Sequence, residues 1–390
     1  MKKLSCEKRA SSLSGRHVLP VGLFLIGLMA CLAIGVSTAQ AQSYSVTDLG
    51  VVKGMSASEP AAINNQGHVA GTSTAGEHGC AFLYSNNTMK DVGGLGSRGL
   101  GVSPFGVVVG DAWLPGQPGP GLFSHAAVFK NGGPLDLGVL EGYVCSRANG
   151  INATGQVVGF SGPQRDGDNS RAFIWTTNTG MIDIGTLGGV YAQANAINDA
   201  GFVTGTASLP DMSESTHAFI YQPLSKTERY TERMRDLGTL GGNSSYGMSI
   251  NAANHVVGYS TINKSDDRAH AFFFDGTKMN DLGSLGRGLG SDYSAALGIN
   301  NSDQVVGYSY RLAGAQDAVQ QVAFVWSRGT KAVGQMINLN TLIGPAGQNY
   351  WLLSATAIND SGQIAACAYD YSTNSVHGVL LTPTAPPLVR

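Results

Sequence analysis

One sequence pattern recurs seven times along this 390-residue chain and constrains its fold more than any other feature. The segment 234–274 shows it most clearly (MRDLGTLGGNSSYGMSINAANHVVGYSTINKSDDRAHAFFF). Four short apolar pieces follow one another: one ending in Ile-Asn, then Val-Val-Gly-Tyr-Ser, then His-Ala-Phe, then Met-x-Asp-Leu-Gly. Each piece is bounded by Gly, Asn, Ser or Asp, which indicates a β-strand. No segment after residue 41 has a sustained helical period, so we expect an all-β fold.

The Asp-Leu-Gly piece sets the length of the repeat. Its aspartate column lies at Asp48, Asp91, Asp136, Asp183, Asp236, Asp281 and, with a change of residue, Asn338. Successive members are 43, 45, 47, 53, 45 and 57 residues apart. A period of roughly 40–50 residues with four strands in each unit is typical of a β-propeller blade. The sequence therefore predicts a seven-bladed β-propeller with four-stranded blades.

The two ends of the repeat array complement each other. Residues 44–50 read as a fourth strand with no blade before it, and residues 377–381 read as a third strand with no Asp-Leu-Gly after it. An unpaired strand edge is a template for unwanted pairing with other chains. We therefore expect the N-terminal strand to complete the last blade and close the ring.

Two further columns are predicted to be structural. Asn ends the inner strand in six repeats, and three residues later only Gly, Asn or Asp occurs, as a hairpin with a left-handed residue requires. The asparagines should bond the backbone of this turn. Histidine begins the third strand in four repeats, where we expect it to bond the neighbouring aspartate column and not a metal. The columns are Asn64, Ser103, Asn152, Asn198, Asn251, Asn300 and Asn359, and His125, His217, His270 and His377.

The N-terminus has the features of a secretory signal peptide. Five basic residues precede an uncharged apolar run over 18–36, and Ala39-Gln40-Ala41 follows as a small-x-small cleavage pattern. We predict cleavage after Ala41, which leaves 42–390 as a single propeller domain in the periplasm or outside the cell. The run is also long enough to remain as a membrane anchor, and residues 28–31 loosely resemble a lipoprotein box.

Composition and cysteine content argue against nucleic acid as a partner and against a disulfide framework. Charged residues make up 13% of the chain and the formal net charge is −2, so no basic patch indicates nucleic acid. Beyond the leader, Cys80, Cys145 and Cys367 remain, an odd number without metal-ligand spacing. We expect buried free thiols, with a Cys80–Cys367 bridge left open because ring closure makes their blades neighbours. No cofactor is predicted, and we expect a monomer.

Binding is predicted on one face of the ring. The links from fourth to first strand and from second to third strand open on that face, and the second kind varies most. One variable link carries Asp166 and Asp168, which are weak calcium candidates because the distal Glu of a full ligand loop is missing. Aromatic and polar residues that enter the inner strands would ring the channel mouth and suit a sugar, unless they only pack between blades. These candidates are Tyr143, Tyr191, Asn243, Tyr246, Asp292, Tyr293 and Trp351.

Catalytic motifs are missing from the sequence. It has no Gly-x-Ser-x-Gly nucleophile elbow, no His-Glu-x-x-His and no phosphate loop. We therefore predict a secreted or cell-surface, non-catalytic binding module for a glycan or a protein partner. The alternative is a secreted lyase or hydrolase acting on extracellular polysaccharide, which would need a non-repeated cluster of His, Arg and carboxylate side chains.

The recurring DLGTLGG, IN-x-x-G-x-VVGYS and HAF pieces resemble the bacterial HAF-type extracellular repeat family. The resemblance covers essentially all of the chain after the leader. It implies a secreted or surface-exposed protein and supplies no catalytic residues.

Overall fold

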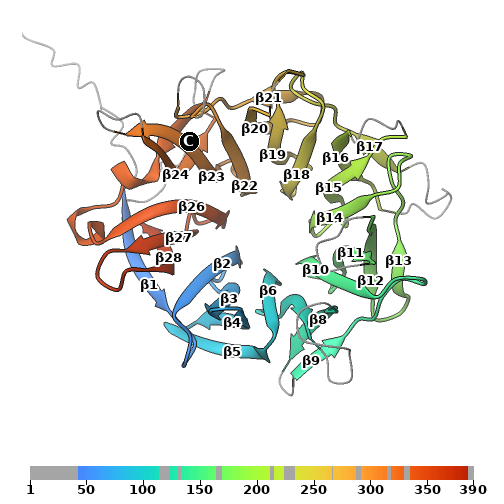
Figure 1. Ribbon diagram of the computed structural model, residues 1–390, viewed down its shortest axis with the longest axis horizontal. Helices are drawn as coiled ribbons and strands as arrows, with labels where there is room; N and C mark the ends of the chain where they lie inside the picture. Colours follow the sequence, from blue (N-terminus) through green and yellow to red (C-terminus); the bar gives the residue numbers. More distant parts are fainter. Residues whose placement is uncertain are drawn as a thin grey trace, which may run out of the picture. The chain divides into compact units, whose positions relative to one another are not determined.

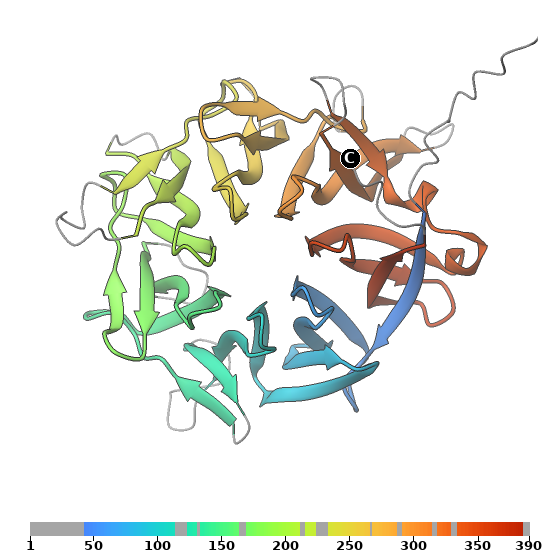
Figure 2. The same cartoon turned by 180° about the vertical axis from the view of Figure 1, so that it is seen from behind.

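The computed structural model describes residues 43–113, 123–130, 133–163, 169–210, 215–223, 233–265, 267–286, 291–313, 318–328 and 334–384. The predicted leader, 1–41, and the calcium candidates Asp166 and Asp168 lie outside these residues. Within the compact unit Ala41–Arg390, seven antiparallel sheets of four strands each stand in a ring (Figures 1 and 2). The predicted all-β, seven-bladed propeller is confirmed.

The first four blades each run through four consecutive strands. Blade 1 is β2 (Ala57–Ile63), β3 (Val69–Ala75), β4 (His78–Ser85) and β5 (Thr88–Leu95). Blade 2 is β6 (Ser97–Val102), β7 (Val108–Ala112), β8 (His125–Lys130) and β9 (Gly133–Asp136). Blade 3 is β10 (Cys145–Ile151), β11 (Val157–Gly162), β12 (Arg171–Thr176) and β13 (Gly180–Asp183). Blade 4 is β14 (Ala192–Ile197), β15 (Val203–Ser208), β16 (Thr216–Tyr221) and β17 (Met234–Asp236).

The remaining blades follow the same order until the last. Blade 5 is β18 (Ser245–Ile250), β19 (Val256–Thr261), β20 (Ala269–Phe274) and β21 (Met279–Asp281). Blade 6 is β22 (Ser294–Ile299), β23 (Val305–Ala313), β24 (Ala318–Ser327) and β25 (Gln335–Asn338), followed by the 3-10 turns η2 (Leu339–Thr341) and η3 (Pro345–Gly347). Blade 7 is β26 (Tyr350–Ile358), β27 (Ile364–Asp370), β28 (Ser375–Pro383) and β1 (Tyr44–Gly50).

Blade 7 joins the two ends of the chain. β1 pairs antiparallel with β28, with Tyr44 opposite Pro383 and Asp48 opposite Val379. β1, in blue, accordingly lies beside the red strands of the last blade in both views (Figures 1 and 2). The predicted closure by the N-terminal strand is confirmed.

The inner strands of all seven blades line a central channel. We call the two ends of the ring the turn face, where each inner strand turns into the second strand, and the loop face, which carries the other links. On the turn face, Asn254 (φ 63°) and Asp303 (φ 57°) occupy the left-handed region, as does glycine at the same position in the other five blades. The predicted turn chemistry is confirmed.

The asparagine column does more than shape its own turns. The Oδ1 atom of Asn251, for example, accepts from the backbone N–H groups of Ala253 (3.1 Å) and His255 (3.0 Å). Its Nδ2 donates to the carbonyl of Asn300 in the next blade (3.1 Å). The same bond to the next blade is made by Asn64, Asn152, Asn198, Asn300 and Asn359. Six amides thus link the blades around the turn face, with a gap only after Ser103.

Filling this gap should stabilise the ring. The Ser103 hydroxyl accepts from the backbone N–H groups of Phe105 (3.2 Å) and Val107 (3.0 Å) but offers no amide to the carbonyl of Asn152. Ser103→Asn keeps both acceptor bonds and adds the seventh link, so we expect the free energy of unfolding to rise by about 1 kcal/mol. Urea denaturation would measure it, with Ser302→Asn on an exposed turn as the control. A lower stability would show that blade 2 has no room for the amide.

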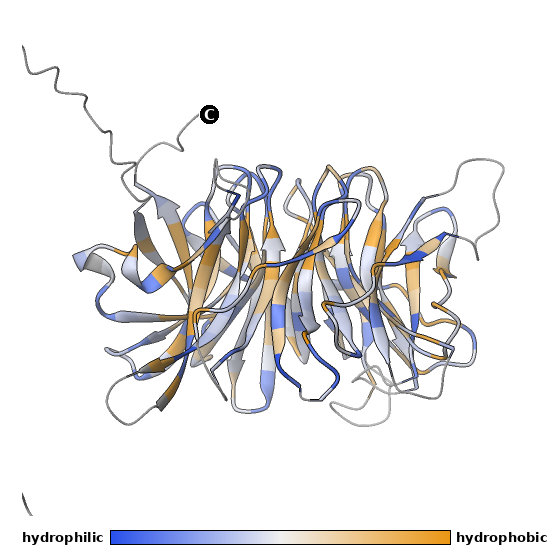
Figure 3. Cartoon of the chain, turned by 90° about the horizontal axis from the view of Figure 1, so that it is seen from above, coloured by the Kyte–Doolittle hydropathy of each residue, from blue (hydrophilic) through white to orange (hydrophobic). Residues whose placement is uncertain are grey.

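The core lies between the blades. Seven clusters of buried apolar side chains occupy the blade junctions. The third-strand aromatics Phe82, Phe173, Phe219, Phe272 and Phe324 are fully buried there, which suits the large apolar area they remove from water. Hydrophobic residues follow the strands between the two faces, and hydrophilic residues gather at the turns (Figure 3).

No disulfide joins Cys80, Cys145 and Cys367 of the propeller. Cys80 and Cys145 are buried and Cys367 is half-buried, and the Cys80–Cys367 bridge that the sequence left open is not formed. Over the described residues, no helix has the length and apolar character needed to span a bilayer.

Candidate functional site

Histidine and aspartate columns meet at the edge of the loop face. The Nδ1 atoms of the four column histidines lie 2.8–3.0 Å from aspartate carboxylates, in the pairs His125–Asp136, His217–Asp236, His270–Asp281 and His377–Asp48. In blade 3 an arginine takes the place of histidine, and Arg171 Nε lies 2.9 Å from Asp183. Each of these aspartates also accepts from the backbone N–H two residues later, at Gly138 for example. The predicted structural bond between the two columns is confirmed.

These pairs predict how stability depends on pH. Burial alone would raise the pKa of Asp136 and Asp236, but their hydrogen bonds to His125 and His217 and to backbone N–H groups outweigh it, so each pKa is lowered. Their contribution is therefore present above the ordinary aspartate pKa of about 3.9 and is lost as pH falls through the folded pKa. Burial would lower the pKa of His270, but bonds to Asp281 and Asp292 raise it. Its contribution is complete below about pH 6.5 and is lost as pH rises through the folded pKa.

We therefore expect the free energy of unfolding to fall at both ends of the range from pH 3 to pH 9. Urea denaturation at each pH would measure it. In His270→Gln the alkaline loss should shrink while the acid loss remains. An unchanged alkaline loss in this variant would contradict the role given to His270.

One histidine has an environment that does not repeat. His270 Nε2 lies 2.9 Å from Asp292, whose carboxylate also accepts from Ser284 (2.7 Å) and from Arg268 (3.4 Å). This is a non-repeated group of His, Arg and carboxylate side chains, which the enzymatic alternative requires. Both carboxylates that flank the imidazole are already bonded, as expected of an ion-pair network that holds the link between blades 5 and 6.

A second carboxylate also approaches His377. The potential metal-binding atoms of Asp48, Asp370 and His377 lie within 4.8 Å of one another. His377 Nδ1 bonds Asp48 (2.8 Å), and the buried Asp370 accepts from the hydroxyls of Ser372 and Thr373. The His377–Asp48 bond joins β28 to β1, and the Asp370 bonds hold the turn between β27 and β28.

The structure gathers three of the predicted tyrosines and adds three more. Tyr246 stacks on Tyr259 with ring centroids 4.6 Å apart, and Tyr293 lies 6.1 Å from Tyr308 and 5.6 Å from Tyr310. Burial raises the pKa of Tyr259 and Tyr293. All these tyrosine rings are half-buried. Because the rings stack on each other, they cover part of the aromatic surface on which a sugar would stack. The tyrosine cluster consists of Tyr191, Tyr246, Tyr259, Tyr293, Tyr308 and Tyr310.

The remaining predicted residues lie apart from the tyrosine cluster or are bonded elsewhere. Tyr143 lines a separate pocket between blades 3 and 4, together with Val190. Asn243 is exposed on the link between blades 4 and 5. Trp351 donates its indole N–H to the carbonyl of Gln321 (3.1 Å) and lies under the Arg311 guanidinium. Ligand binding by these residues stays a prediction.

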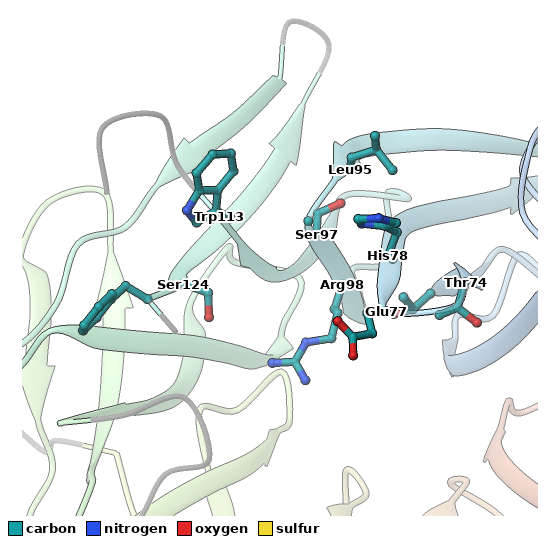
Figure 4. Close-up of a pocket in the computed structure, with 12 residues that line it drawn as sticks. Thr74, Glu77, His78, Leu95, Ser97, Arg98, Trp113 and Ser124 are labelled. Atoms are coloured by element: carbon teal, nitrogen blue, oxygen red, sulfur yellow. The ribbon is translucent and has the colours of Figure 1, made fainter. Parts of the chain in front are cut away.

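A cavity of about 600 Å³ opens on the loop face at the junction of blades 1 and 2. Trp113 of blade 2 stands on one side of it, and Leu95 and His78 stand on the other (Figure 4). Leu95 is 65% exposed and Trp113 is 37% exposed, although both are large and apolar. The lining consists of Thr72, Thr74, Glu77, His78, Gly79, Leu95, Gly96, Ser97, Arg98, Trp113, Phe123 and Ser124.

The cavity exists because one link is short. In five blades a serine at the first or second position of the inner strand donates its hydroxyl to a backbone carbonyl. The carbonyl belongs to a glycine that follows the aspartate column. The two residues are 7 to 11 positions apart in four blades and only 3 apart for Ser97 and Gly94. Only Gly96 therefore separates β5 from β6. Among the described residues, this junction lacks a longer link of the kind that the other four blades have.

Below the cavity lies a buried ion pair. Arg98 of β6 bonds both carboxylate oxygens of Asp111 on β7, with Nε–Oδ1 and Nη2–Oδ2 distances of 2.9 and 3.0 Å. The Asp111 side chain is completely buried, and Arg147 Nε of blade 3 lies 3.8 Å from it. The pair fixes the Arg98 side chain, which forms part of the cavity wall.

Sequence reasoning missed this cavity, although a signal was present. Asp91 is six positions from Ser97, whereas Asp136 is ten from Ser146 and Asp236 is nine from Ser245. A deletion in a link between otherwise regular repeats indicates an uncovered junction.

Comparison with known proteins gives a family of unknown function and distantly similar solved structures. A family described as "protein of unknown function (DUF3466)" matches residues 138–285, which run from the link before blade 3 to the link after blade 5, less than half of the chain. No curated protein sequence matches the chain.

The resemblance to HAF-type extracellular repeat proteins is wrong, because the family model that matches is the DUF3466 family and not a HAF-type one. The short pieces that suggested it recur because the blades share the same turns and most of them share the same serine and aspartate bonds. Such pieces report blade geometry and not membership of a family.

Two solved structures of a Bombyx mori GH32 beta-fructofuranosidase are similar to this chain. A mutant in complex with sucrose has a TM-score of 0.32 and 10% identity, over 87% of this chain and 90% of that chain. Another structure of the enzyme has a TM-score of 0.29 and 10% identity over the same shares. Likeness at this level carries no argument about function. What is established is therefore the β-propeller fold itself.

Proposed function

We propose that this protein is a non-catalytic interaction module, secreted or displayed at the cell surface, that binds a protein partner at the cavity between blades 1 and 2. The observation that carries the proposal is the uncovered junction with Trp113 and Leu95 exposed at its mouth. A partly exposed tryptophan beside a concavity is the kind of residue that dominates protein interfaces.

The distribution of exposed apolar residues supports the loop face as the binding face. Of the nine large apolar side chains exposed among the described residues, seven lie on loop-face links or hairpins: Leu95, Trp113, Val144, Val190, Leu312, Val319 and Tyr371. Phe105 lies on the turn face and Leu135 on an outer strand. Apolar residues gathered on one face indicate an interaction surface.

Two sequence features support the remainder of the proposal. The leader pattern over 1–41 favours export from the cytoplasm. The aspartates and histidines on the loop face recur from blade to blade in bonded pairs, whereas a catalytic group is expected to be unique.

Site-specific photo-cross-linking tests the proposal. A photo-reactive amino acid at Leu95 should give a discrete protein adduct in the native host, and Trp113→Ala should abolish it. The same amino acid at Leu135, which is 44% exposed on the outer strand of blade 2, is the matched control. Identical adducts from both positions, or an adduct from position 95 that persists in Trp113→Ala, would exclude the cavity as the binding site.

The tyrosine cluster supports a second candidate function, glycan binding at the inner strands of blades 4 to 6. Six half-buried tyrosines from neighbouring strands and the links that enter them offer hydroxyls to a neutral, hydroxylated ligand. A bound glycan raises the midpoint of thermal unfolding by mass action. We expect this shift to be lost in Tyr308→Phe, which keeps the ring packing and removes the hydroxyl. A panel of extracellular glycans that gives no shift with the unmodified protein would rule this candidate out.

A further inference from the structure

Several links between blades share one arrangement, which the junction of blades 1 and 2 lacks. At four junctions the backbone N–H of an apolar link residue donates to a serine on the second strand of the next blade. These bonds, 2.8–3.1 Å long, are Val52 to Ser73, Leu140 to Ser161, Leu240 to Ser260 and Leu285 to Ser309. The side chains of these four link residues also pack against buried clusters. Each of these four links therefore covers its junction with one apolar residue and one backbone bond.

At the junction of blades 1 and 2 both partners are missing. Leu95 has the sequence position of Leu240, four residues after the aspartate column, but it is 65% exposed. Ala112 has the position of the acceptor serine, because it pairs with Ser97 as Ser260 pairs with Ser245. Among the described residues, the buried cluster at this junction includes no link residue equivalent to Leu240.

Among the described residues no link covers the cavity, and we infer that it is a slot for a link-like segment whose occupant is a peptide of the partner protein carrying a leucine-like side chain between small residues. This inference rests on the proposed function and specifies the partner. The argument for a peptide is internal to the chain, which covers the equivalent junction between blades 4 and 5 with its own Thr239-Leu240-Gly241-Gly242. Glycines beside the leucine let the backbone approach the sheet ends closely.

The contacts available in the slot match such a segment. Trp113 and Leu95 offer apolar surface to one side chain, and Thr72 and Thr74 offer hydroxyls to its backbone. Burying a leucine side chain here provides the hydrophobic contribution that the other junctions obtain from their own links. A glycan has no comparable apolar branch to place in this position.

A peptide of the chain's own link tests the inference. The probe is a capped synthetic peptide with the sequence of residues 236–244, DLGTLGGNS, titrated into the full-length protein and followed by calorimetry. We expect saturable binding, at least about ten-fold weaker when the peptide carries Leu240→Ala, because the leucine supplies most of the buried apolar area. Trp113→Ala in the protein should weaken binding to a similar extent.

A second variant should strengthen binding. Ala112→Ser restores the acceptor for the backbone N–H of the peptide leucine, and we expect about five-fold tighter binding. The new hydroxyl would donate to the carbonyl of Gly96, as Ser161 does to the carbonyl of Cys145, so the variant should fold.

The outcomes separate the two proposals. Equal affinity of the leucine and alanine peptides, or no binding of either to the unmodified protein and to Ala112→Ser, overturns the inference. If a Trp113-dependent adduct still forms at position 95, the proposed function survives and the partner uses another chemistry. If the peptide binds but no adduct forms, the cavity does accept a link-like peptide, and the proposed function of binding a protein partner there is wrong.

Discussion

Asp111→Asn is expected to lower the free energy of unfolding by about 3–5 kcal/mol, because it leaves two half-buried guanidinium groups without their carboxylate. The Asp111 side chain is 0% exposed and bonds Arg98 through two oxygens, with Arg147 close by. Removing one member of a buried pair costs the solvation that the other member gave up on folding. Equilibrium urea denaturation measures the loss directly.

The chain offers a matched control for this prediction. Arg171 and Asp183 form a pair with the same 2.9 Å Nε–O distance, but their side chains are 27% and 38% exposed. Asp183→Asn should cost less than about 1 kcal/mol, because water replaces the lost charge interaction. Equal losses at the two sites would show that burial of Asp111 is not what makes its pair important.

Asn251→Ala should lower the free energy of unfolding by about 2–4 kcal/mol. The side chain is buried and makes four hydrogen bonds, two to backbone N–H groups of its own turn and two to Asn300 and Asp303 of the next blade. Alanine leaves buried donors and acceptors without partners, which costs more than the bonds themselves contribute. Thermal and urea unfolding should agree on the loss.

Asn301, which follows Asn300 on the turn face, provides the control for this prediction. Asn301→Ala removes an exposed side chain that bonds Asp360 and the backbone N–H of Ala252, and water can satisfy all the groups left behind. We expect a loss below about 1 kcal/mol. If Asn251→Ala costs no more than this, the links between blades at the turn face contribute little to stability.

Features that every blade shares could be predicted from the sequence. The turn after each inner strand needs a residue with a left-handed backbone. The sequence therefore already predicted the column of Gly, Asn and Asp residues that includes Asn254, Asp303 and Gly362. The histidine and aspartate columns recur at fixed spacing, so their bond was also foreseeable. Repetition turns a weak local signal into a strong one.

Features that depend on the pairing of particular strands could not be predicted in the same way. Tyr259 joins the tyrosine cluster because the antiparallel register places it opposite Tyr246, and the motif around it reads only as a generic strand. Arg98 and Asp111 meet by the same register in blade 2. The cavity arises from residues that are missing, and a missing segment leaves only a shortened spacing to find.

Closure of the ring constrains when the last blade can be completed during folding. The hydrogen bond between the N–H of Thr384 and the carbonyl of Ser43 spans 341 positions in the chain. A ribosome makes β1 first and β28 last, so the first strand to be synthesised is the last to find its partner. The entropy cost of such a closure grows only with the logarithm of the chain length, roughly (3/2)RT ln n. Its rate, however, falls as contacts become more distant along the chain. Completion of blade 7 is therefore the step that should set the overall folding time.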